Sequence, residues 1–180
     1  MRKIYKRISI IVLILCFSSV ILFTACSEKG SGSSSISEEV YQLGNQEIQI
    51  ELSDNFKCTK ENDDQIILEG ESGRIQIKDM DGNGISSDFF PKSEQECAAL
   101  FQDVIGTVSY QIEDFHSYEE EGLYYATIRY DLEKEIKYLI VSGKFSADAG
   151  CQISAILDTG NRETAQKIQS AVYNVKVFIE

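Results

Sequence analysis

The chain has 180 residues, which is enough for one domain with a sizeable hydrophobic core and too few for two ordinary domains. Its 17 lysines and arginines stand against 29 aspartates and glutamates, a formal net charge of −12. This acidic balance argues against nucleic-acid binding, which needs clustered basic side chains to displace counterions. With 43% hydrophobic residues, the composition is that of a globular protein and not of a disordered one.

The first 26 residues have the order of a secretory signal. Four cations precede an uncharged, mostly apolar run over residues 8–25, and that run ends in small residues directly before Cys26. The string LFTAC at residues 22–26 resembles the lipobox of bacterial lipoproteins. That family usually has leucine three residues before the cysteine, where this chain has Phe23, with Leu22 one residue further back.

The resemblance implies that a diacylglyceryl group is attached to the Cys26 thiol and that residues 1–25 are removed as a signal peptide. Two acyl chains matter because a single chain gives only marginal, reversible membrane binding. The alternative is an uncleaved membrane-spanning helix, because an apolar run of about 18 residues can just cross a bilayer. Both interpretations place the rest of the chain at the cell membrane, on its extracytoplasmic face.

Cleavage before Cys26 would remove four positive charges and no negative one. The remaining chain would carry 13 lysines and arginines against 29 acidic residues, a formal charge of −16. Anionic headgroups attract basic segments, not acidic ones. We therefore expect the lipid to be the only attachment of the domain to the membrane.

Residues 26–40 predict a flexible tether, since the string SEKGSGSSSIS is rich in glycine and serine and poor in apolar residues. A single α+β domain is expected over residues 41–180. The domain is predicted to begin with four short strands that form an antiparallel meander, at residues 47–52, 56–60, 65–69 and 74–79.

The second half of the domain predicts two main helices and a sheet of long strands. Ser93 and Glu96 have the spacing of a capping box before an apolar helical pattern that ends around Gly106. Asn161 is expected to cap the last helix, and residues 175–179 to form a short strand or the exit of that helix. Long strands are predicted at residues 108–117, 123–132, 136–145 and 150–158. Two of these strands are apolar on both faces, which predicts that helices cover both sides of the sheet.

This order of elements resembles the PsbP/Mog1-type α/β/α sandwich, which recurs in secreted bacterial lipoproteins. The resemblance covers residues 47–178, and its sequence cues are Ile-x-Ile-x-Leu-x-Asp-x-Phe from Ile48 and Ile-Gln-Ser-Ala-Val from Ile168. Family members often have proline where this chain has Ser53. The resemblance implies a mostly antiparallel sheet flanked by two main helices, preceded here by the signal helix. It also implies a scaffold used for binding and assembly, and it transfers no catalytic residues.

One string resembles the first half of an EF-hand calcium loop, Asp79-Met-Asp81-Gly-Asn83-Gly84. Asp79, Asp81 and Asn83 stand where such a loop supplies oxygen ligands. The second half departs, because the position that needs a bidentate glutamate is Phe90. The string indicates either a glycine-rich turn or a calcium site. No other cofactor is expected.

Three cysteines follow the lipobox, Cys58, Cys97 and Cys151, each on the apolar face of its predicted element. That position favours buried thiols, since free cysteine behaves as a small hydrophobe. A disulfide is the alternative outside the cytoplasm, and three pairings are open. A zinc site with the lone His116 lacks the Cys-x-x-Cys spacing that such sites normally show.

Asp114, His116 and Ser117 are residue types of a hydrolase, but no serine has the glycines of a nucleophile elbow. Neighbours on one strand rarely form a catalytic triad. The tyrosines of the long strands suggest either a sugar-stacking platform or ordinary packing in a sheet. No catalytic residue is assigned.

The sequence thus favours a lipid-anchored, non-enzymatic binding or accessory module that acts through a protein partner at the cell envelope. One alternative is a small-ligand or calcium-binding lipoprotein that uses the loop Asp79–Gly84. A remote alternative is a hydrolase.

Overall fold

The structure is a computed structural model and describes residues 37–52, 56–80, 90–146 and 149–179, with the side chain of Ile179 left out. The predicted signal helix, most of the predicted tether, and both Asp81 and Asn83 lie outside these residues. The strands are β1 (Ser37–Leu43), β2 (Gln46–Leu52), β3 (Lys57–Glu61), β4 (Gln65–Gly70), β5 (Gly73–Asp79), β6 (Tyr110–Tyr118), β7 (Leu123–Leu132), β8 (Glu135–Phe145), β9 (Gly150–Leu157) and β10 (Lys176–Ile179). The helices are α2 (Glu94–Leu100), α3 (Gln102–Ile105), the 3-10 turn η1 (Glu119–Glu121) and α4 (Arg162–Tyr173).

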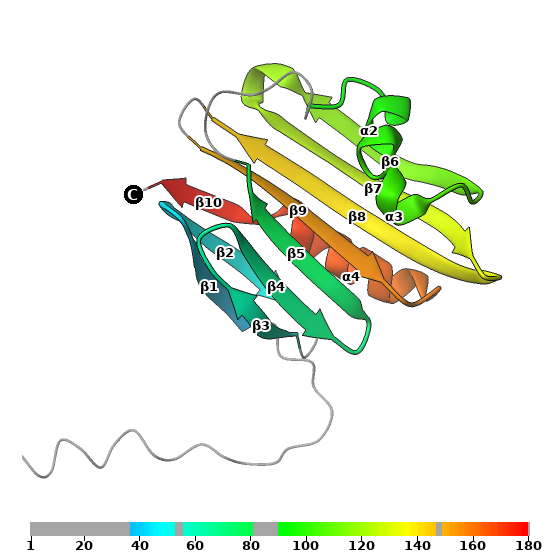
Figure 1. The fold of residues 1–180 in the computed structure, drawn as a ribbon, viewed down its shortest axis with the longest axis horizontal. Coiled ribbons are helices and arrows are strands. Elements are labelled where there is room, and N and C mark those ends of the chain that lie inside the picture. Colours follow the sequence, from blue (N-terminus) through cyan, green and yellow to red (C-terminus); the bar gives the residue numbers. More distant parts are fainter. Residues whose placement is uncertain (1–36, 53–55, 81–89, 147–148, 180) are drawn as a thin grey trace, which may run out of the picture. The chain divides into compact units, whose positions relative to one another are not determined.

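The strands form two sheets in which every neighbouring pair is antiparallel. Seven strands make the large sheet, in the order β3-β4-β5-β9-β8-β7-β6. Three strands make the small sheet, in the order β1-β2-β10 (Figure 1). The predicted α+β class with a mostly antiparallel sheet and flanking helices is confirmed.

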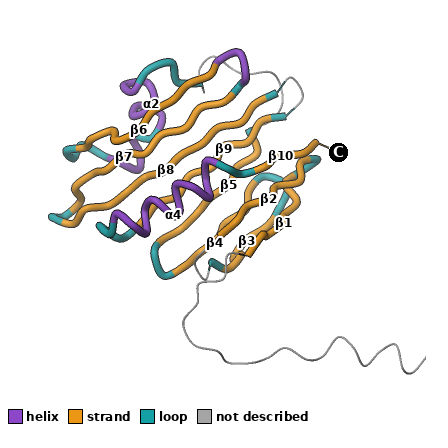
Figure 2. The backbone as a smooth tube through the Cα atoms, turned by 180° about the vertical axis from the view of Figure 1, so that it is seen from behind, coloured by secondary structure: helices purple, strands orange, loops and turns teal. Residues whose placement is uncertain are grey.

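Two hydrophobic cores lie on the two faces of the large sheet. The first core joins Ile140 and Ile153 of the sheet to Ile168 of α4 and Ile48 of the small sheet. The second core joins Leu139 and Val141 of β8 to the short helices α2 and α3. The domain therefore has three layers, with α4 and the small sheet on one face and α2–α3 on the other (Figures 1 and 2).

The predicted meander of four short strands is wrong for its first member. Strands β3, β4 and β5 pair in order, but β2 pairs with β1 and β10 in the small sheet. The hairpin partner β1 begins at Ser37, inside the range predicted as tether. A two-residue turn, Gly44-Asn45, connects β1 to β2, and Gly44 has a φ of 60° that favours glycine. The alternation of apolar and polar residues in β2 correctly indicates which side of the strand faces the core. It carries no information about which strand lies next to β2.

The helix caps are as predicted, and the helix before Gly106 is shorter than predicted. The Ser93 hydroxyl accepts a hydrogen bond from the Glu96 amide at 3.2 Å, and the Asn161 side chain accepts from the Glu163 amide at 2.9 Å. At Phe101 the backbone turns out of the helix with a φ of −113°, which separates α2 from α3. The side chain of Phe101 is buried in the second core, so the apolar spacing continues across the break.

Substitutions at two adjacent residues of β8, Ser142 and Gly143, should have different effects on the free energy of unfolding. A Cβ at Gly143 would overlap the buried ring of Tyr124, so Gly143→Ala should lower the free energy of unfolding by about 1–3 kcal/mol. The Ser142 hydroxyl is buried and has no hydrogen-bond partner among the described residues, so Ser142→Ala should leave this free energy unchanged or raise it. Urea unfolding of the full chain measures both. Equal losses in the two variants would contradict the packing described.

Candidate functional site

Of the predicted calcium ligands, Asp79 is the one within the described residues. It ends β5, and its Oδ1 accepts a hydrogen bond from Gln46 Nε2 at 3.1 Å. Phe90, at the position of the missing glutamate, is buried in the second core against the rings of Tyr124 and Phe145. The packing of Phe90 explains that departure from the EF-hand pattern. The calcium site stays a prediction.

The three described cysteines are free thiols, and among the described residues no group of His, Cys, Asp and Glu is placed to hold a metal. Cys97 and Cys151 are buried as predicted, and burial raises the pKa of each thiol to about 12. Cys58 is exposed, which corrects its predicted inward position. It lies on the outermost strand β3, whose register with β4 shifts between Cys58 and Lys60 and breaks the alternation.

The hydrolase residues are only partly brought together. His116 Nε2 lies 2.9 Å from Asp114 Oδ1. Ser117 points to the other face of β6, where its hydroxyl donates to the Pro91 carbonyl at 2.8 Å. Successive strand residues face opposite sides of a sheet, so the histidine and this serine cannot act together.

A β-bulge in β6 determines which side chains face which layer. Ile112 pairs with Ile128, and Asp114 pairs with Thr127, so Glu113 is the extra residue. Before the bulge, Tyr110 and Ile112 lie opposite residues of the second core; after it, Phe115 takes that side. The bulge thereby turns the even-numbered residues Asp114, His116 and Tyr118 to the face that carries α4.

These residues complete a cluster of four rings, His116, Tyr118, Tyr125 and Tyr173, that we call the aromatic surface. The imidazole of His116 is 6.2 Å from the ring of Tyr118 and nearly parallel to it, and is 4.9 Å from the ring of Tyr125. Tyr125 is also 4.4 Å from Tyr173, which ends α4. Helix α4 lies mainly over β8 and β9 (Figure 2) and reaches β6 and β7 through Gln169 and Tyr173 near its end, so this side of β6 and β7 is only partly covered by the described helices.

The aromatic surface carries hydroxyl groups and is bordered by carboxylates. The hydrogen bond with Tyr118, partial burial, and the nearby Asp114 and Glu121 together raise the pKa of the Tyr125 hydroxyl to about 12. Burial also raises the pKa of Tyr173 to about 12, and its hydroxyl lies 2.8 Å from Thr127 Oγ1. The hydroxyls of Tyr125 and Tyr173 therefore stay neutral at ordinary pH and act as hydrogen-bonding groups beside the rings.

The other strand tyrosines pack in the cores. Tyr124 and Tyr130 are buried in the second core and Tyr138 in the first, as expected of tyrosine in a sheet. The hydroxyl of Tyr124 accepts a hydrogen bond from Gln152 at 2.9 Å. The alternation of residues 123–132 already puts Tyr125 on the opposite face from Tyr124 and Tyr130. The sequence does not show that Tyr118 shares the face of Tyr125, because that depends on the bulge in β6.

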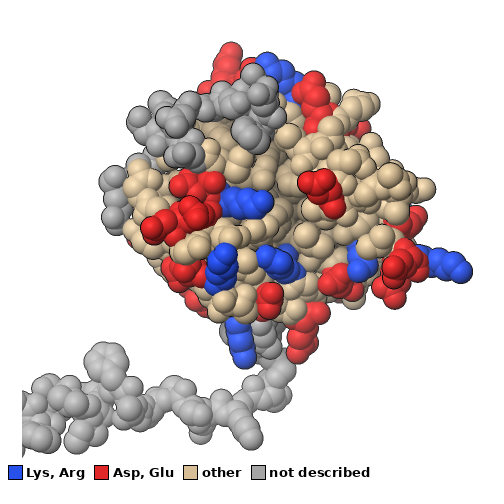
Figure 3. Space-filling view, in the orientation of Figure 1, with Lys and Arg blue, Asp and Glu red and all other residues tan. Residues whose placement is uncertain are grey.

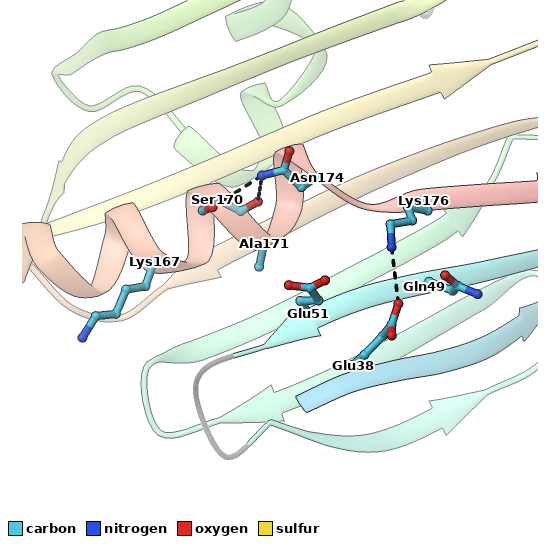
Figure 4. A pocket seen from close by; sticks show the side chains of 8 residues that line it. All are labelled: Glu38, Gln49, Glu51, Lys167, Ser170, Ala171, Asn174 and Lys176. Carbon is cyan, nitrogen blue, oxygen red and sulfur yellow. Dashed lines mark hydrogen bonds and ion pairs between the residues drawn. The ribbon is translucent and has the colours of Figure 1, made fainter. Parts of the chain in front are cut away.

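A groove of about 360 Å³ runs between α4 and the small sheet (Figure 4). Its charged groups are mostly used within the chain: Lys176 pairs with Glu38 at 3.4 Å, and Lys167 pairs with Glu163 at 3.0 Å. Asn174 donates to the Ser170 carbonyl at 2.9 Å. Three of its four charged side chains, Glu38, Lys167 and Lys176, are thus paired within the chain.

A second hollow, of about 530 Å³, lies where β2, β10 and the ends of β8 and β9 meet; we call it the end pocket. Gln46 and Lys144 are polar residues of its lining, and Phe145, Val177 and Phe178 supply apolar walls. Leaving a buried acceptor unpaired costs about 1–3 kcal/mol. Gln46 is in that position, since its Oε1 has no partner among the described residues.

Charge on the face opposite the aromatic surface is mixed. Acidic and basic side chains are interspersed over the described part of that face (Figure 3). The net negative charge is therefore spread on this side and marks no single site there.

No protein-family model and no curated protein matches the chain. The solved structures that are similar to it include the following two. The Ran-binding protein Mog1p of Saccharomyces cerevisiae is 14% identical with a TM-score of 0.47, over 76% of this chain and 85% of that one. Cyanobacterial PsbP from Synechocystis is 11% identical with a TM-score of 0.44, over 88% of this chain and 99% of that one.

These two likenesses concern the arrangement of elements and are weak. They correspond to the PsbP/Mog1-type resemblance expected from the sequence, and they assign neither an activity nor a partner to this chain. Among the described residues, no helix has both the length and the apolar character needed to cross a membrane.

The burial of the thiols predicts a clear order of reactivity. Cys58 should be alkylated by iodoacetamide at pH 8 in the native protein, because it is exposed. Cys97 and Cys151 should react only on unfolding, since burial both shields them and keeps them protonated. Peptide mass mapping of the full chain after timed alkylation measures each site. Labelling of Cys97 or Cys151 as fast as Cys58 would show that the cores are open.

The two interpretations of the Asp79–Gly84 string predict different calorimetry. A calcium site predicts saturable heat when calcium is added to the full chain, and loss of that heat in Asp81→Ala. A glycine-rich turn predicts no heat up to millimolar calcium in either protein. Magnesium is the matched control, because its smaller ion demands near-octahedral geometry.

Proposed function

We propose that this chain is a lipid-anchored lipoprotein on the extracytoplasmic face of the cell membrane, where it acts as a non-enzymatic binding or accessory module through a protein partner. The observation that carries the binding role is the aromatic surface. It places the rings of His116, Tyr118 and Tyr125 on the part of the sheet face that the described helices cover only partly, beside Tyr173 at the end of α4.

Rings of this kind suit protein recognition. Tyrosine gives a large, rigid, partly apolar contact with few rotatable bonds and is enriched at the centres of protein interfaces. Tyr118 is 41% exposed, although large apolar surfaces are usually buried. A partner that covers this ring would gain both the apolar contact and the hydroxyl groups.

The carboxylates beside the rings favour a basic partner segment. Asp114 and Glu121 lie close enough to act on the Tyr125 hydroxyl, and His116 contacts Asp114. A lysine or arginine side chain that lies over a tyrosine ring gains a cation–π interaction, and the carboxylates add to the attraction. The formal charge of −16 that remains after cleavage before Cys26 favours the approach of such a segment.

The non-enzymatic part of the proposal rests on the geometry around His116. The ring contacts Asp114 and two tyrosines, and the neighbouring serine is on the other face of the sheet. The anchoring part rests on the lipobox-like string before Cys26 and the glycine- and serine-rich segment after it.

Replacing Cys26 with alanine tests the anchor. We expect the parent protein to lack residues 1–25 and to carry the added mass of acyl chains, because the thiol is the proposed attachment atom. Cys26→Ala should lose both changes. Intact-mass measurement on the membrane fraction distinguishes the cases. A parent with the full 180-residue mass, unchanged by the substitution, would show a spanning helix in place of the lipid.

Tyrosine substitutions test the binding surface. Tyr118→Ala/Tyr125→Ala should lower recovery of a partner crosslinked in intact cells by about tenfold or more, since buried interface tyrosines each contribute over about 1 kcal/mol. Tyr110→Ala is the matched control: it is on the same strand and 47% exposed, but before the bulge and on the opposite face.

Both variants should remain folded at the temperature of the assay. Thermal denaturation checks this, because their unfolding midpoints should lie above that temperature. Equal partner recovery from the double variant and from Tyr110→Ala would contradict the proposed surface. Recovery of no partner above background from the parent chain would contradict the binding role itself.

A further inference from the structure

The end pocket shares Tyr173 with the aromatic surface, and three features of its other lining residues mark it as a binding site. It lies where the start of β2 pairs with β10 and where Gln46 contacts Gly150 at the start of β9. Its volume, about 530 Å³, is in the range of small-molecule sites, about 300–1,000 Å³. A pocket of this size can hold a small organic molecule.

The first feature is an acceptor without a donor. Gln46 is 1% exposed, and its Nε2 donates to Asp79 Oδ1 at 3.1 Å and to the Gly150 carbonyl at 3.4 Å. Turning the amide over would set its oxygen against these two acceptors, so the orientation is determined by its surroundings. Gln46 Oε1 is therefore left without a partner among the described residues, while Gln46 lines the pocket. Buried polar groups are rarely left in this way.

The second feature is a cation without an anion. Lys144 is half-buried and lines the pocket, and its ammonium donates to the Val175 carbonyl. No described carboxylate lies within ion-pair distance of it, whereas Lys92, Lys137, Lys167 and Lys176 each have one. Burial accordingly lowers the pKa of Lys144. An anion in the pocket would give this ammonium the charged partner that the described residues do not provide.

The third feature is an apolar wall that remains partly open. Phe145 and Val177 are half-buried in the lining, and Phe178 is 47% exposed. Most small-molecule sites have such walls with a few polar groups that orient the ligand. A ring or short hydrocarbon body would cover Phe178 and leave its polar ends to Lys144 and Gln46.

We propose that the end pocket binds a small organic acid. Its carboxylate pairs with the Lys144 ammonium, and its apolar body packs against Phe145, Val177 and Phe178. On binding, a hydroxyl or N–H group of the acid displaces the atoms that cover Gln46 Oε1 and donates to it. This site adjoins the partner surface, with which it shares Tyr173, but the groups that would bind the acid are not part of that surface.

Calorimetry on the full chain in a non-ionic detergent tests the proposal with three matched probes. These are 4-hydroxybenzoate, its neutral analogue 4-hydroxybenzamide, and benzoate, which lacks the donor. We expect 4-hydroxybenzoate to bind saturably, 4-hydroxybenzamide to bind at least about tenfold more weakly, and benzoate to lie between them. Equal affinity for the acid and the amide, or no saturable binding of the acid up to about 10 mM, would overturn the proposal.

Lys144→Met is the informative variant, because it keeps the length of the side chain and removes the charge. It should bind the acid and the amide equally. Lys137→Met is the control, since Lys137 lies on the same strand and pairs with Asp158 at 2.7 Å outside the pocket. It should keep the parent's preference for the acid. A preference that survives in Lys144→Met would also overturn the proposal. If Lys144→Met does not fold, the relative affinities of the three probes for the parent chain still test the proposal.

Discussion

Strand β8 must bury both of its faces, and the layers of the domain follow from this requirement. Tyr138 and Ile140 point into the first core, and Leu139 and Val141 point into the second. A sheet that is apolar on both faces needs a layer on each side. The chain supplies α2–α3 on one side, and α4 with a separate three-stranded sheet on the other.

The covering layers are shorter than the sheet, and this leaves room for function. Helix α4 lies mainly over β8 and β9, so the described helices cover the α4 side of β6 and β7 only in part (Figure 2). The bulge at Glu113 turns His116 and Tyr118 onto that side, next to Tyr125 of β7 and Tyr173 of α4. A single inserted residue thus converts the end of an outer strand into part of an exposed aromatic cluster.

Local patterns predicted the elements well where one interaction decides them. The bounds of β7 are those predicted from its alternation, and Asn161 caps α4 because its side chain can reach two backbone amides. Patterns failed where the outcome depended on distant partners. The pairing of β2 with β10 joins residues more than a hundred positions apart, and alternation carries no information about it. The Gly44-Asn45 turn was the available signal for the β1–β2 hairpin.

The site was harder to predict than the fold, for a physical reason. Residues 108–117 alternate only moderately because the bulge changes the parity of the strand, and that change separates Tyr110 from Tyr118. The end pocket depends on Gln46 and Lys144, which lie 98 positions apart and look like ordinary polar strand residues in the sequence. Cys58 was misplaced for a similar reason, since the register shift in β3 breaks its alternation.

The central claim is that the face carrying Tyr118 is the one that meets a partner. A photo-crosslinking amino acid placed at position 118, or at position 110 on the opposite face of β6, tests it in intact cells. The account predicts a discrete crosslinked product from position 118 and none from position 110. The same product from both positions, or a product from position 110 alone, would contradict it.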